Sequence, residues 1–233
     1  MTFTHLNKLG DFELEANTID GVRYYTLPNG KKAPSITSVT SFYNRQIFLN
    51  WRKKVGEEEA NKITKVSTDR GTRFHDLVEK YLLNKDINTI DGVLPTTKAL
   101  FVAAKDSLDN INNIHALEKP LYSEYFGIAG RVDCIAEYNG ELAIIDFKTS
   151  KKPKPREWVD HYFVQCMAYG CMLYELTGIA VKKLVIIMAC ENGESIVYEE
   201  YDKKKYIKLL TEYIREFIQH KIESYADSTR QRV

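Results

Sequence analysis

Two short segments, Gly130-Arg-Val-Asp133 and Asp146-Phe-Lys148-Thr149-Ser150, decide the fold of this chain. Between them lies Asn139-Gly140, and this dipeptide between alternating apolar residues is the strongest short-range signal for a two-residue hairpin turn. If the turn forms, counting equally along both strands places Asp133 directly opposite Asp146. Opposed side chains have Cβ atoms about 4.5–5.5 Å apart, where like charges destabilise a sheet. A buried carboxylate pair is tolerated when it shares a proton or binds a cation, so the pattern predicts one of these.

Lys148 adds a positive charge to the same strand face, because it follows Asp146 by two residues. Carboxylate oxygens are the ligands that Mg²⁺ or Mn²⁺ prefers, and such a cation would polarise a phosphodiester and acidify a bound water. Lys148 would then orient the water or stabilise charge on the phosphate. The alternative is an exposed ladder of Asp and Lys, but Ile144, Ile145 and Phe147 indicate a core strand, where unexplained charges are costly. Both interpretations depend on the register, since a shift of one residue moves the two acids to opposite faces.

The bulk properties exclude several classes of protein. With 233 residues and 44% hydrophobic content, the chain suits one large domain, or one domain with an appended lobe. A formal net charge of +1 excludes a wholesale polyelectrolyte binder, so a nucleic-acid surface requires local clusters of basic residues. No apolar run approaches the roughly 20 residues that span a bilayer, so we expect no membrane partner. The first 17 residues show neither an apolar signal core nor an Arg-rich transit pattern, which predicts a cytoplasmic location.

The periodicity predicts an α/β fold, with a central sheet covered by helices on both sides. The expected helices cover 35–54, about 56–66, a stretch after Gly71, 96–113, 156–177 and a C-terminal amphipathic segment. The expected strands cover a small hairpin within 11–28, then 120–138 with a break near Gly127, 141–149, 181–190 and 194–200. In the central hairpin, alternation places Val132, Cys134, Ile145 and Phe147 on one face, and Ile135, Leu142 and Ile144 on the other.

Two helices carry candidate accessory residues. His75 and Glu79 share a face of the third helix, so His75 could give a metal a nitrogen ligand, although such a pair is often solvated. Gly71-Thr72 could open that helix and bring its N–H groups near a phosphate. On the helix after the hairpin one face carries His161, Gln165 and Tyr169, which suit either DNA contact or ordinary packing at the edge of the core.

A basic loop leaves the second strand of the hairpin. A cationic, proline-stiffened loop beside a hydrolytic site suits phosphate contacts, although an isolated loop of this kind is usually a solvated linker. The candidate DNA-binding residues outside the helix face are Thr149, Ser150, Lys151, Lys152, Lys154 and Arg73. The remaining basic and aromatic residues before residue 74 are better explained by packing and solvated charge.

Four motifs together resemble the PD-(D/E)xK nuclease superfamily in its RecB-like branch. They are His75, Gly130-Arg-Val-Asp133, Asp146-Phe-Lys148 and Gln165-Cys-Met-Ala-Tyr169, in the order and spacing of that branch. Within it, residues 130–169 look most like mitochondrial genome maintenance exonucleases. The resemblance implies a nuclease core with a central mixed β-sheet flanked by helices and an N-terminal helical region.

The resemblance also implies an exonuclease that uses Mg²⁺ or Mn²⁺ and acts on single-stranded DNA with a free end. His75, Asp133, Asp146 and the main-chain carbonyl of Phe147 would hold the metal, and Lys148 would be catalytic. Glu79 is a possible accessory residue. Replication or recombination proteins are possible partners.

Other expectations concern organisation and origin. We expect one nuclease domain, with a hairpin and helical lid at 1–70, the catalytic core at 71–200 and a C-terminal helix at 201–233. The cysteines lack CxxC spacing and none precedes Cys134, so we expect reduced thiols and no iron–sulfur cluster. Without a transit signature, we expect the cytoplasm of a bacterial or phage-infected cell rather than a mitochondrion. A structure-selective endonuclease and a catalytically silent DNA-binding module remain as alternatives.

Overall fold

A mixed five-stranded sheet forms the centre of the computed structural model, which describes residues 2–10 and 12–230. The strand order is β4-β5-β6-β7-β8, and only β6 and β7 are parallel. The strands are β4 (Ile111–Ser123), β5 (Ile128–Tyr138), β6 (Glu141–Ser150), β7 (Lys183–Cys190) and β8 (Ser195–Glu200). The parallel pair requires a crossover, which α5 (Asp160–Thr177) supplies after a short 3₁₀ turn, η2 (Arg156–Trp158).

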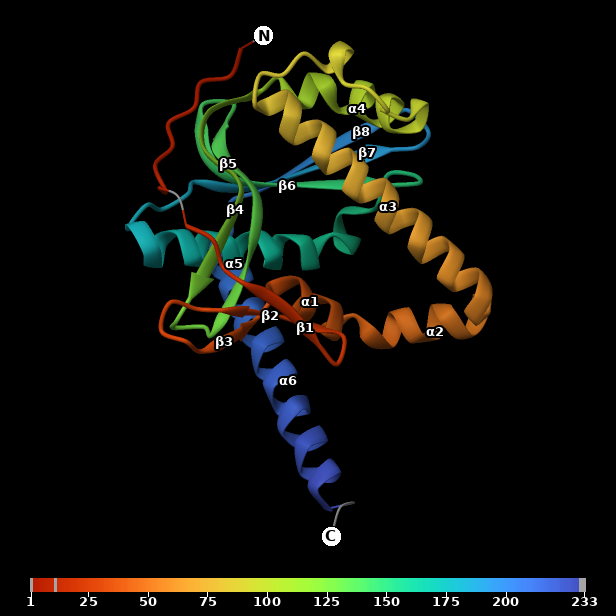
Figure 1. The fold of residues 1–233 in the computed structure, drawn as a ribbon, viewed down its shortest axis with the longest axis vertical. Coiled ribbons are helices and arrows are strands. Elements are labelled where there is room, and N and C mark those ends of the chain that lie inside the picture. Colours follow the sequence, from red (N-terminus) through yellow and green to blue (C-terminus); the bar gives the residue numbers. More distant parts are fainter. Residues whose placement is uncertain (1, 11, 231–233) are drawn as a thin grey trace.

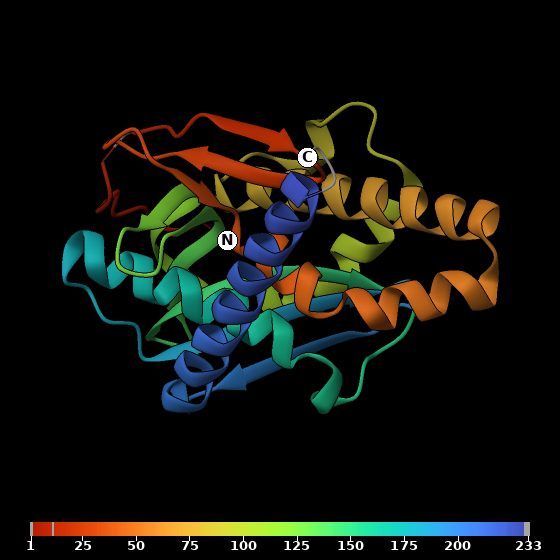
Figure 2. The same cartoon turned by 90° about the horizontal axis from the view of Figure 1, so that it is seen from below.

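Helices cover both faces of this sheet (Figure 1). On one face α5 packs with α1 (Ile36–Tyr43) and α6 (Lys203–Arg230), and Figure 2 shows α6 lying across α5. On the other face lie α3 (Glu57–Leu82) and α4 (Pro95–Leu108), which are joined through η1 (Ile87–Thr89). Each face has its own apolar core, so the α/β architecture predicted from the sequence is confirmed.

The central hairpin has the predicted register. Its paired residues run from Tyr138–Glu141 at the turn to Cys134–Ile145, and Asn139 and Gly140 both have the positive φ that a type I′ turn needs. The regular pairing of β5 with β6 stops there, so Asp133 and Asp146 lie just past the end of the ladder. Figure 1 shows β4 and β5 bending away from the direction of β6. The two acids therefore sit where the sheet opens.

The predicted faces of the hairpin are right except at Val132. Cys134, Ile145 and Phe147 pack under α3 and α4 as one group, whereas Val132 packs with Ile144 under α5. The alternation breaks because the pairing of β4 with β5 skips Glu118 and Asp133, and Glu118 has a left-handed φ of 45°. A local irregularity of this kind changes which side a strand residue faces.

The N-terminal helices differ from the expected ones. The segment after Ser35 forms α1 and then α2 (Arg45–Val55), with a break at Asn44, and Ser35 caps α1 by accepting the Ser38 N–H at 3.1 Å. The two predicted helices on either side of Gly71 are one continuous α3. The proposed helix start at Gly71-Thr72, with its phosphate site, is therefore wrong. The limit expected at residue 70, between the lid and the catalytic core of the single domain, falls inside this helix.

Two further elements have other bounds than expected. The helix expected over 96–113 ends at Leu108, and the chain enters β4 at Ile111. The expected strand over 120–138 is two strands, separated by a turn in which Gly127 has a φ of 62°. The earlier start of β4 brings Glu118 into the sheet.

A three-stranded sheet precedes the core. It consists of β1 (Ala16–Ile19), β2 (Val22–Thr26) and β3 (Lys32–Pro34), which confirms the predicted hairpin around Asp20-Gly21. No helix in the described ranges is long and apolar enough to cross a membrane.

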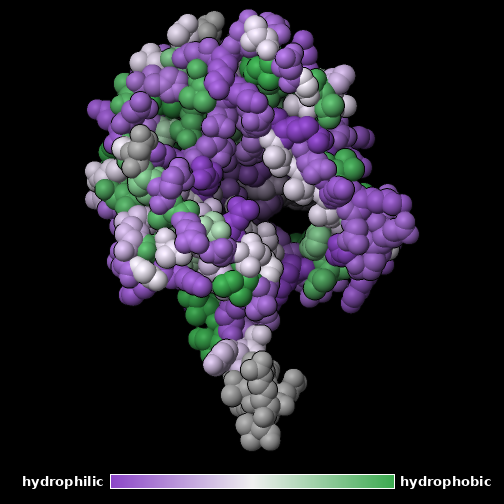
Figure 3. Space-filling model, viewed as in Figure 1, coloured by the Kyte–Doolittle hydropathy of each residue, from purple (hydrophilic) through white to green (hydrophobic). Residues whose placement is uncertain are grey.

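Helix α2 and the first half of α3 project from the body as an arm (residues 45–69). None of the α2 residues, all of which the structure describes, is buried. The arm rejoins the body where Arg70 donates to Thr149 at the end of β6 and pairs with Glu191. Figure 3 shows an open passage between the arm and the body.

Candidate active site

His75 reaches the end of the sheet from α3. Its neighbours Phe74, Leu77 and Val78 are buried against the sheet, and this fixes the direction of the helix. His75 Nε2 lies 2.7 Å from the carbonyl oxygen of Phe147. Because a carbonyl only accepts, Nε2 carries the proton in that contact, and Nδ1 is turned toward the carboxylates of the site.

The side chain of Asp133 binds the backbone of β6 just beyond the last regular pair of β5 with β6. Its Oδ2 accepts the N–H of Phe147 at 2.8 Å and lies 3.6 Å from His75 Nδ1. Asp133 as a whole residue is 8% exposed, so its carboxylate is nearly buried. Asp133 thereby ties β5 to β6 at the point where their regular pairing ends.

Asp146 is held from two sides and is 1% exposed. Gln165 Nε2 of α5 donates to its Oδ1 at 3.0 Å, and Lys148 Nζ lies 2.5 Å from its Oδ2. The Lys148 ammonium group is thus the direct partner of Oδ2, and it balances the charge of this buried carboxylate. A buried carboxylate that faces an ammonium group shows that this end of the sheet accommodates positive charge.

Glu118 completes the group. Its Oε1 lies 3.9 Å from His75 Nδ1, and one donor atom from each of His75, Glu118 and Asp133 lies within 4.8 Å of the others. One imidazole nitrogen and two carboxylates form a donor set that suits a divalent cation. These residues therefore fit a metal ion.

Buried charges shift the pKa values of this site. Burial is the largest influence on Asp146 and raises its pKa to about 6, although Lys148 acts against it. Burial opposes the charged form of Lys148, but Asp146 and Asp133 raise its pKa above the ordinary value. Burial also opposes charge on His75, yet Asp133 and Glu118 raise its pKa to about 9. The pocket between these carboxylates thus strongly favours positive charge.

Tyr169 supports the site from behind and is 1% exposed. A Cβ on Gly130 would lie 2.8 Å from Tyr169 Cε1, closer than real Cβ contacts, and 3.1 Å from Ile36 Cγ2, which is also tight. Gly130 is therefore needed for the close packing of β5 on α5 and α1. The structure places Tyr169 in this packing, where it has almost no surface to offer DNA.

His161 is the partly exposed member of the predicted helix face. Burial, together with Lys154 and Lys148, lowers the pKa of His161 to about 4, so the ring is neutral near pH 7. Lys154 Nζ donates to the hydroxyl of Tyr162 at 2.9 Å, and Lys148 Nζ lies 5.0 Å from the centroid of that ring. Tyr162 thus links the loop lysine to the lysine of the site.

The remaining predicted residues lie around the site without converging on it. Lys151, Lys152 and Arg73 are exposed, whereas Ser150 is buried. Burial, then Glu118, raises the pKa of Glu79, which places its carboxyl near the acidic group.

Sequence reasoning left the role of Glu118 open and did not identify Tyr162 and Arg70 as neighbours of the site. Glu118 was detectable in principle, because a hairpin turn at 124–127 sets it opposite Asp133, but the strand was expected to begin only near residue 120. Tyr162 and Arg70 carry no sequence signal that separates them from other helix residues.

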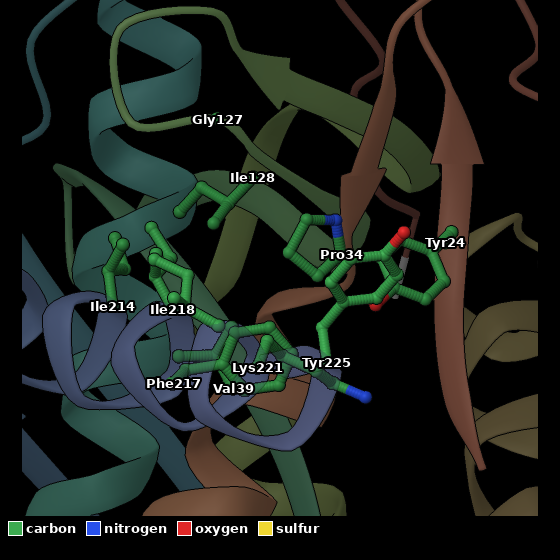
Figure 4. A pocket seen from close by; sticks show the side chains of 11 residues that line it. Tyr24, Pro34, Val39, Gly127, Ile128, Ile214, Phe217, Ile218, Lys221 and Tyr225 are labelled. Atoms are coloured by element: carbon green, nitrogen blue, oxygen red, sulfur yellow. The ribbon is translucent and has the colours of Figure 1, made fainter. Parts of the chain in front are cut away.

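An apolar cavity of about 390 Å³ lies away from these residues, between α6 and the edge of β2 and β3 (Figure 4). Pro34, Ile128 and Phe217 contribute to its lining, and it includes none of the charged residues described above. It is separate from the candidate active site.

Comparison with known proteins gives a consistent answer. The model of the PD-(D/E)XK nuclease superfamily matches residues 95–231. Mitochondrial genome maintenance exonuclease 1 from Homo sapiens is 30% identical over 173 residues, which cover 69% of this chain and 50% of the human protein. The protein of the same name from Mus musculus is 31% identical over 130 residues, covering 52% and 38%. This chain thus spans about half, or less, of the length of these relatives.

Solved structures match more distantly. A crystal structure described as a candidate exonuclease from Eubacterium rectale covers 65% of this chain and 65% of its own, with 12% identity and a TM-score of 0.45. A likeness at this level carries no argument about activity.

The comparisons correct one expectation and confirm another. A cytoplasmic location in a bacterial or phage-infected cell is contradicted, because the named relatives are mitochondrial proteins of eukaryotes. The lack of a transit pattern was a poor guide to location, since only the first 17 residues were compared with such patterns. The resemblance drawn from the four motifs is confirmed by the match over more than half of the chain. The chain belongs to the PD-(D/E)XK nuclease superfamily and is related to the genome maintenance exonucleases.

Proposed function

We propose that this protein is a metal-dependent exonuclease that hydrolyses single-stranded DNA from free ends. The observation that carries the proposal is the group of donor atoms from His75, Glu118 and Asp133, which lie within 4.8 Å of one another. The buried ion pair of Asp146 and Lys148 belongs to the same site. Nucleases of this superfamily use divalent metal ions. His75, Asp133, Asp146 and the carbonyl of Phe147 are the groups that would hold Mg²⁺ or Mn²⁺. When bound, the ion polarises the phosphodiester and lowers the pKa of a water molecule.

The chain's own residues position and stabilise charge. Lys148 keeps its charge, because Asp146 and Asp133 raise its pKa against burial. Its ammonium group can therefore donate to the phosphate oxygens as negative charge develops. Gln165 fixes Asp146 Oδ1 from α5, so that Oδ2 keeps its direction. Asp133 is fixed in the same manner by the Phe147 N–H.

The arm supports a requirement for ends. A single strand with a free end can enter the passage between the arm and the body, whereas a closed circle cannot thread through it (Figure 3). On α2 the side chain of Phe48 is 45% exposed, and its ring lies 5.5 Å from that of Trp51. Exposed aromatic rings stack on bases whatever the sequence, and Lys53 and Lys54 on the same helix are exposed for phosphate contacts.

The loop after β6 supports binding of the DNA backbone. Lys151 and Lys152 are exposed, and Lys154 extends over Tyr162 toward Lys148. We assign Thr149 and His161 to the same surface as candidate positioning residues, whereas Ser150 is buried and has little surface to offer DNA. In this proposal the whole chain works as one nuclease domain, with the arm as its lid and partners in replication or recombination.

Substitution of the two central residues tests the proposal. Asp146→Asn and Lys148→Ala should each abolish cleavage of single-stranded DNA while leaving its binding within a few fold. The first removes a ligand of the metal and the second removes the ammonium group that contacts the reacting phosphate, whereas the arm and the basic loop still bind the rest of the strand. Asp91→Asn, on an exposed loop, is the matched control and should cut normally. Retained turnover in a carefully repurified Asp146→Asn protein would refute the assignment.

A further inference from the structure

Glu118 has a backbone conformation that glutamate rarely adopts. Its φ of 45° lies in the left-handed region, where the Cβ of a residue with a side chain crowds the following carbonyl oxygen. The β4–β5 pairing includes Leu117–Cys134 and Lys119–Val132 on either side and skips Glu118 and Asp133 between them. Arg131 Nη1 holds this conformation by donating to the Glu118 carbonyl oxygen at 2.6 Å.

The irregular backbone brings the Glu118 carboxylate to the candidate active site. Its Oε1 lies 3.9 Å from His75 Nδ1, and Asp133 Oδ2 lies 3.6 Å from the same nitrogen. The Glu118 and His75 side chains are 25% and 27% exposed, so this group can be reached from solvent. Asp146, the other carboxylate of the site, is almost fully buried and is held by Gln165 and Lys148.

The ring of His75 is oriented for a ligand on that side. Nε2 faces the Phe147 carbonyl at 2.7 Å, and a carbonyl contact of this kind fixes the tautomer of a metal-binding histidine. Nδ1 is then the nitrogen that can bind a cation together with Glu118 and Asp133. The Phe147 carbonyl oxygen accepts this bond with one lone pair and keeps the other for the ion.

We propose that Glu118 is a metal ligand of this protein. With His75 Nδ1 and Asp133 it forms a cation-binding site that favours Mn²⁺ over Mg²⁺. The proposal rests on the proposed metal-dependent function and adds a ligand that the four motifs do not contain. The imidazole nitrogen sets the preference, because Mg²⁺ favours oxygen ligands and keeps its waters, whereas Mn²⁺ accepts a mixed set. The rival explanation is that Glu118 only balances the charge of a protonated His75.

The test measures metal binding without DNA, so it does not depend on cleavage. Mn²⁺ is titrated into the whole chain and followed by electron paramagnetic resonance, and Mg²⁺ is then added in competition. Glu118→Gln should weaken Mn²⁺ binding about tenfold or more. Glu79→Gln is the matched control, because it removes one acidic group from the same neighbourhood and leaves the three donors in place; its effect should stay below about threefold.

A second variant guards against misfolding. Glu118→Gly removes the carboxylate and suits the left-handed backbone, so in EDTA it should unfold no earlier than the wild type, yet it should bind Mn²⁺ as weakly as Glu118→Gln. Wild-type Mn²⁺ affinity in both variants, or an equal loss in Glu79→Gln, would overturn the proposal. If the wild type binds Mn²⁺ through Glu118 but cuts no DNA, the proposed function is refuted, whereas the proposed cation-binding site is supported.

Discussion

Gln165 of α5 donates to Asp146 of β6 at 3.0 Å, and both side chains are buried. This contact joins the helix that crosses the sheet to the carboxylate that the ion pair with Lys148 also holds. It explains why one of the four motifs contains a helical glutamine, although that residue carries no charge.

Gln165→Ala tests the contact. The substitution leaves Asp146 Oδ1 buried without its donor, which should lower the free energy of unfolding by about 1–3 kcal/mol. Metal affinity and cleavage should fall about 10–100-fold, as for other groups that orient a metal ligand. Gln219→Ala, which removes an exposed glutamine of α6 bonded to Glu223, is the control. Equal unfolding and equal cleavage for the two variants would show that Gln165 does not support Asp146.

Two glycine substitutions should have opposite effects on stability. Gly130→Ala puts a Cβ 2.8 Å from Tyr169 Cε1 and should destabilise the protein by about 1–3 kcal/mol. Gly71→Ala lies inside α3, has no atom within 4 Å of the new Cβ, and should stabilise the protein by about 1 kcal/mol. Urea unfolding of both variants gives the two values. Destabilisation by Gly71→Ala would contradict a continuous α3.

His161 should make the protein less stable in acid. Burial, with Lys154 and Lys148, lowers the pKa of the folded-state ring to about 4, whereas in the unfolded chain it titrates near 6.5. Between these values the unfolded state takes up a proton that the folded state refuses, so stability falls as pH falls from about 6.5 to 4.

His161→Gln removes that proton uptake. The variant should therefore lose less stability than the wild type between pH 7 and pH 4, by about 2 kcal/mol after allowance for the partly exposed ring. Urea unfolding at several pH values measures the difference. Above pH 7 the gap between the two proteins should be constant, and a gap that also stays constant down to pH 4 would refute the low pKa of His161.

The arm should contribute to binding through its aromatic rings. Phe48→Ala removes an exposed ring of α2 and should weaken binding of single-stranded DNA by about 1–3 kcal/mol. Tyr125→Ala removes a ring that is 84% exposed on the β4–β5 turn and should leave binding unchanged. Fluorescence anisotropy with a labelled oligonucleotide compares the two. Equal effects would mean that α2 is not a base-stacking surface.

The parts of this fold that could be predicted are those determined locally. Asn139-Gly140 fixes the hairpin register because both residues accept positive φ, and Ser35 begins a helix because its hydroxyl caps an N–H. The continuous α3 could not be read in this way. Burial of Phe74, Leu77 and Val78 on the sheet outweighs the small preference of Gly71 against helix.

The candidate site was predictable to the same extent. The motifs supplied His75, Asp133, Asp146 and Lys148, and the structure brings all four together. The role of Glu118 stayed open because its place depends on a left-handed backbone that the sequence does not reveal. Tyr169 was interpreted as a DNA contact, because sequence alone does not show that Gly130 leaves a space for its ring.

Incubation of the purified protein with end-labelled linear and covalently closed circular single-stranded DNA tests the proposed function most directly. Each substrate is given Mg²⁺, Mn²⁺ or EDTA, beside Lys148→Ala as the inactive control. We predict loss of the linear strand alone, only with metal and only with the wild type, and the position of the label will give the polarity. Cutting of the circle would contradict the requirement for ends and indicate an endonuclease, and binding without any cutting would contradict the nuclease activity itself.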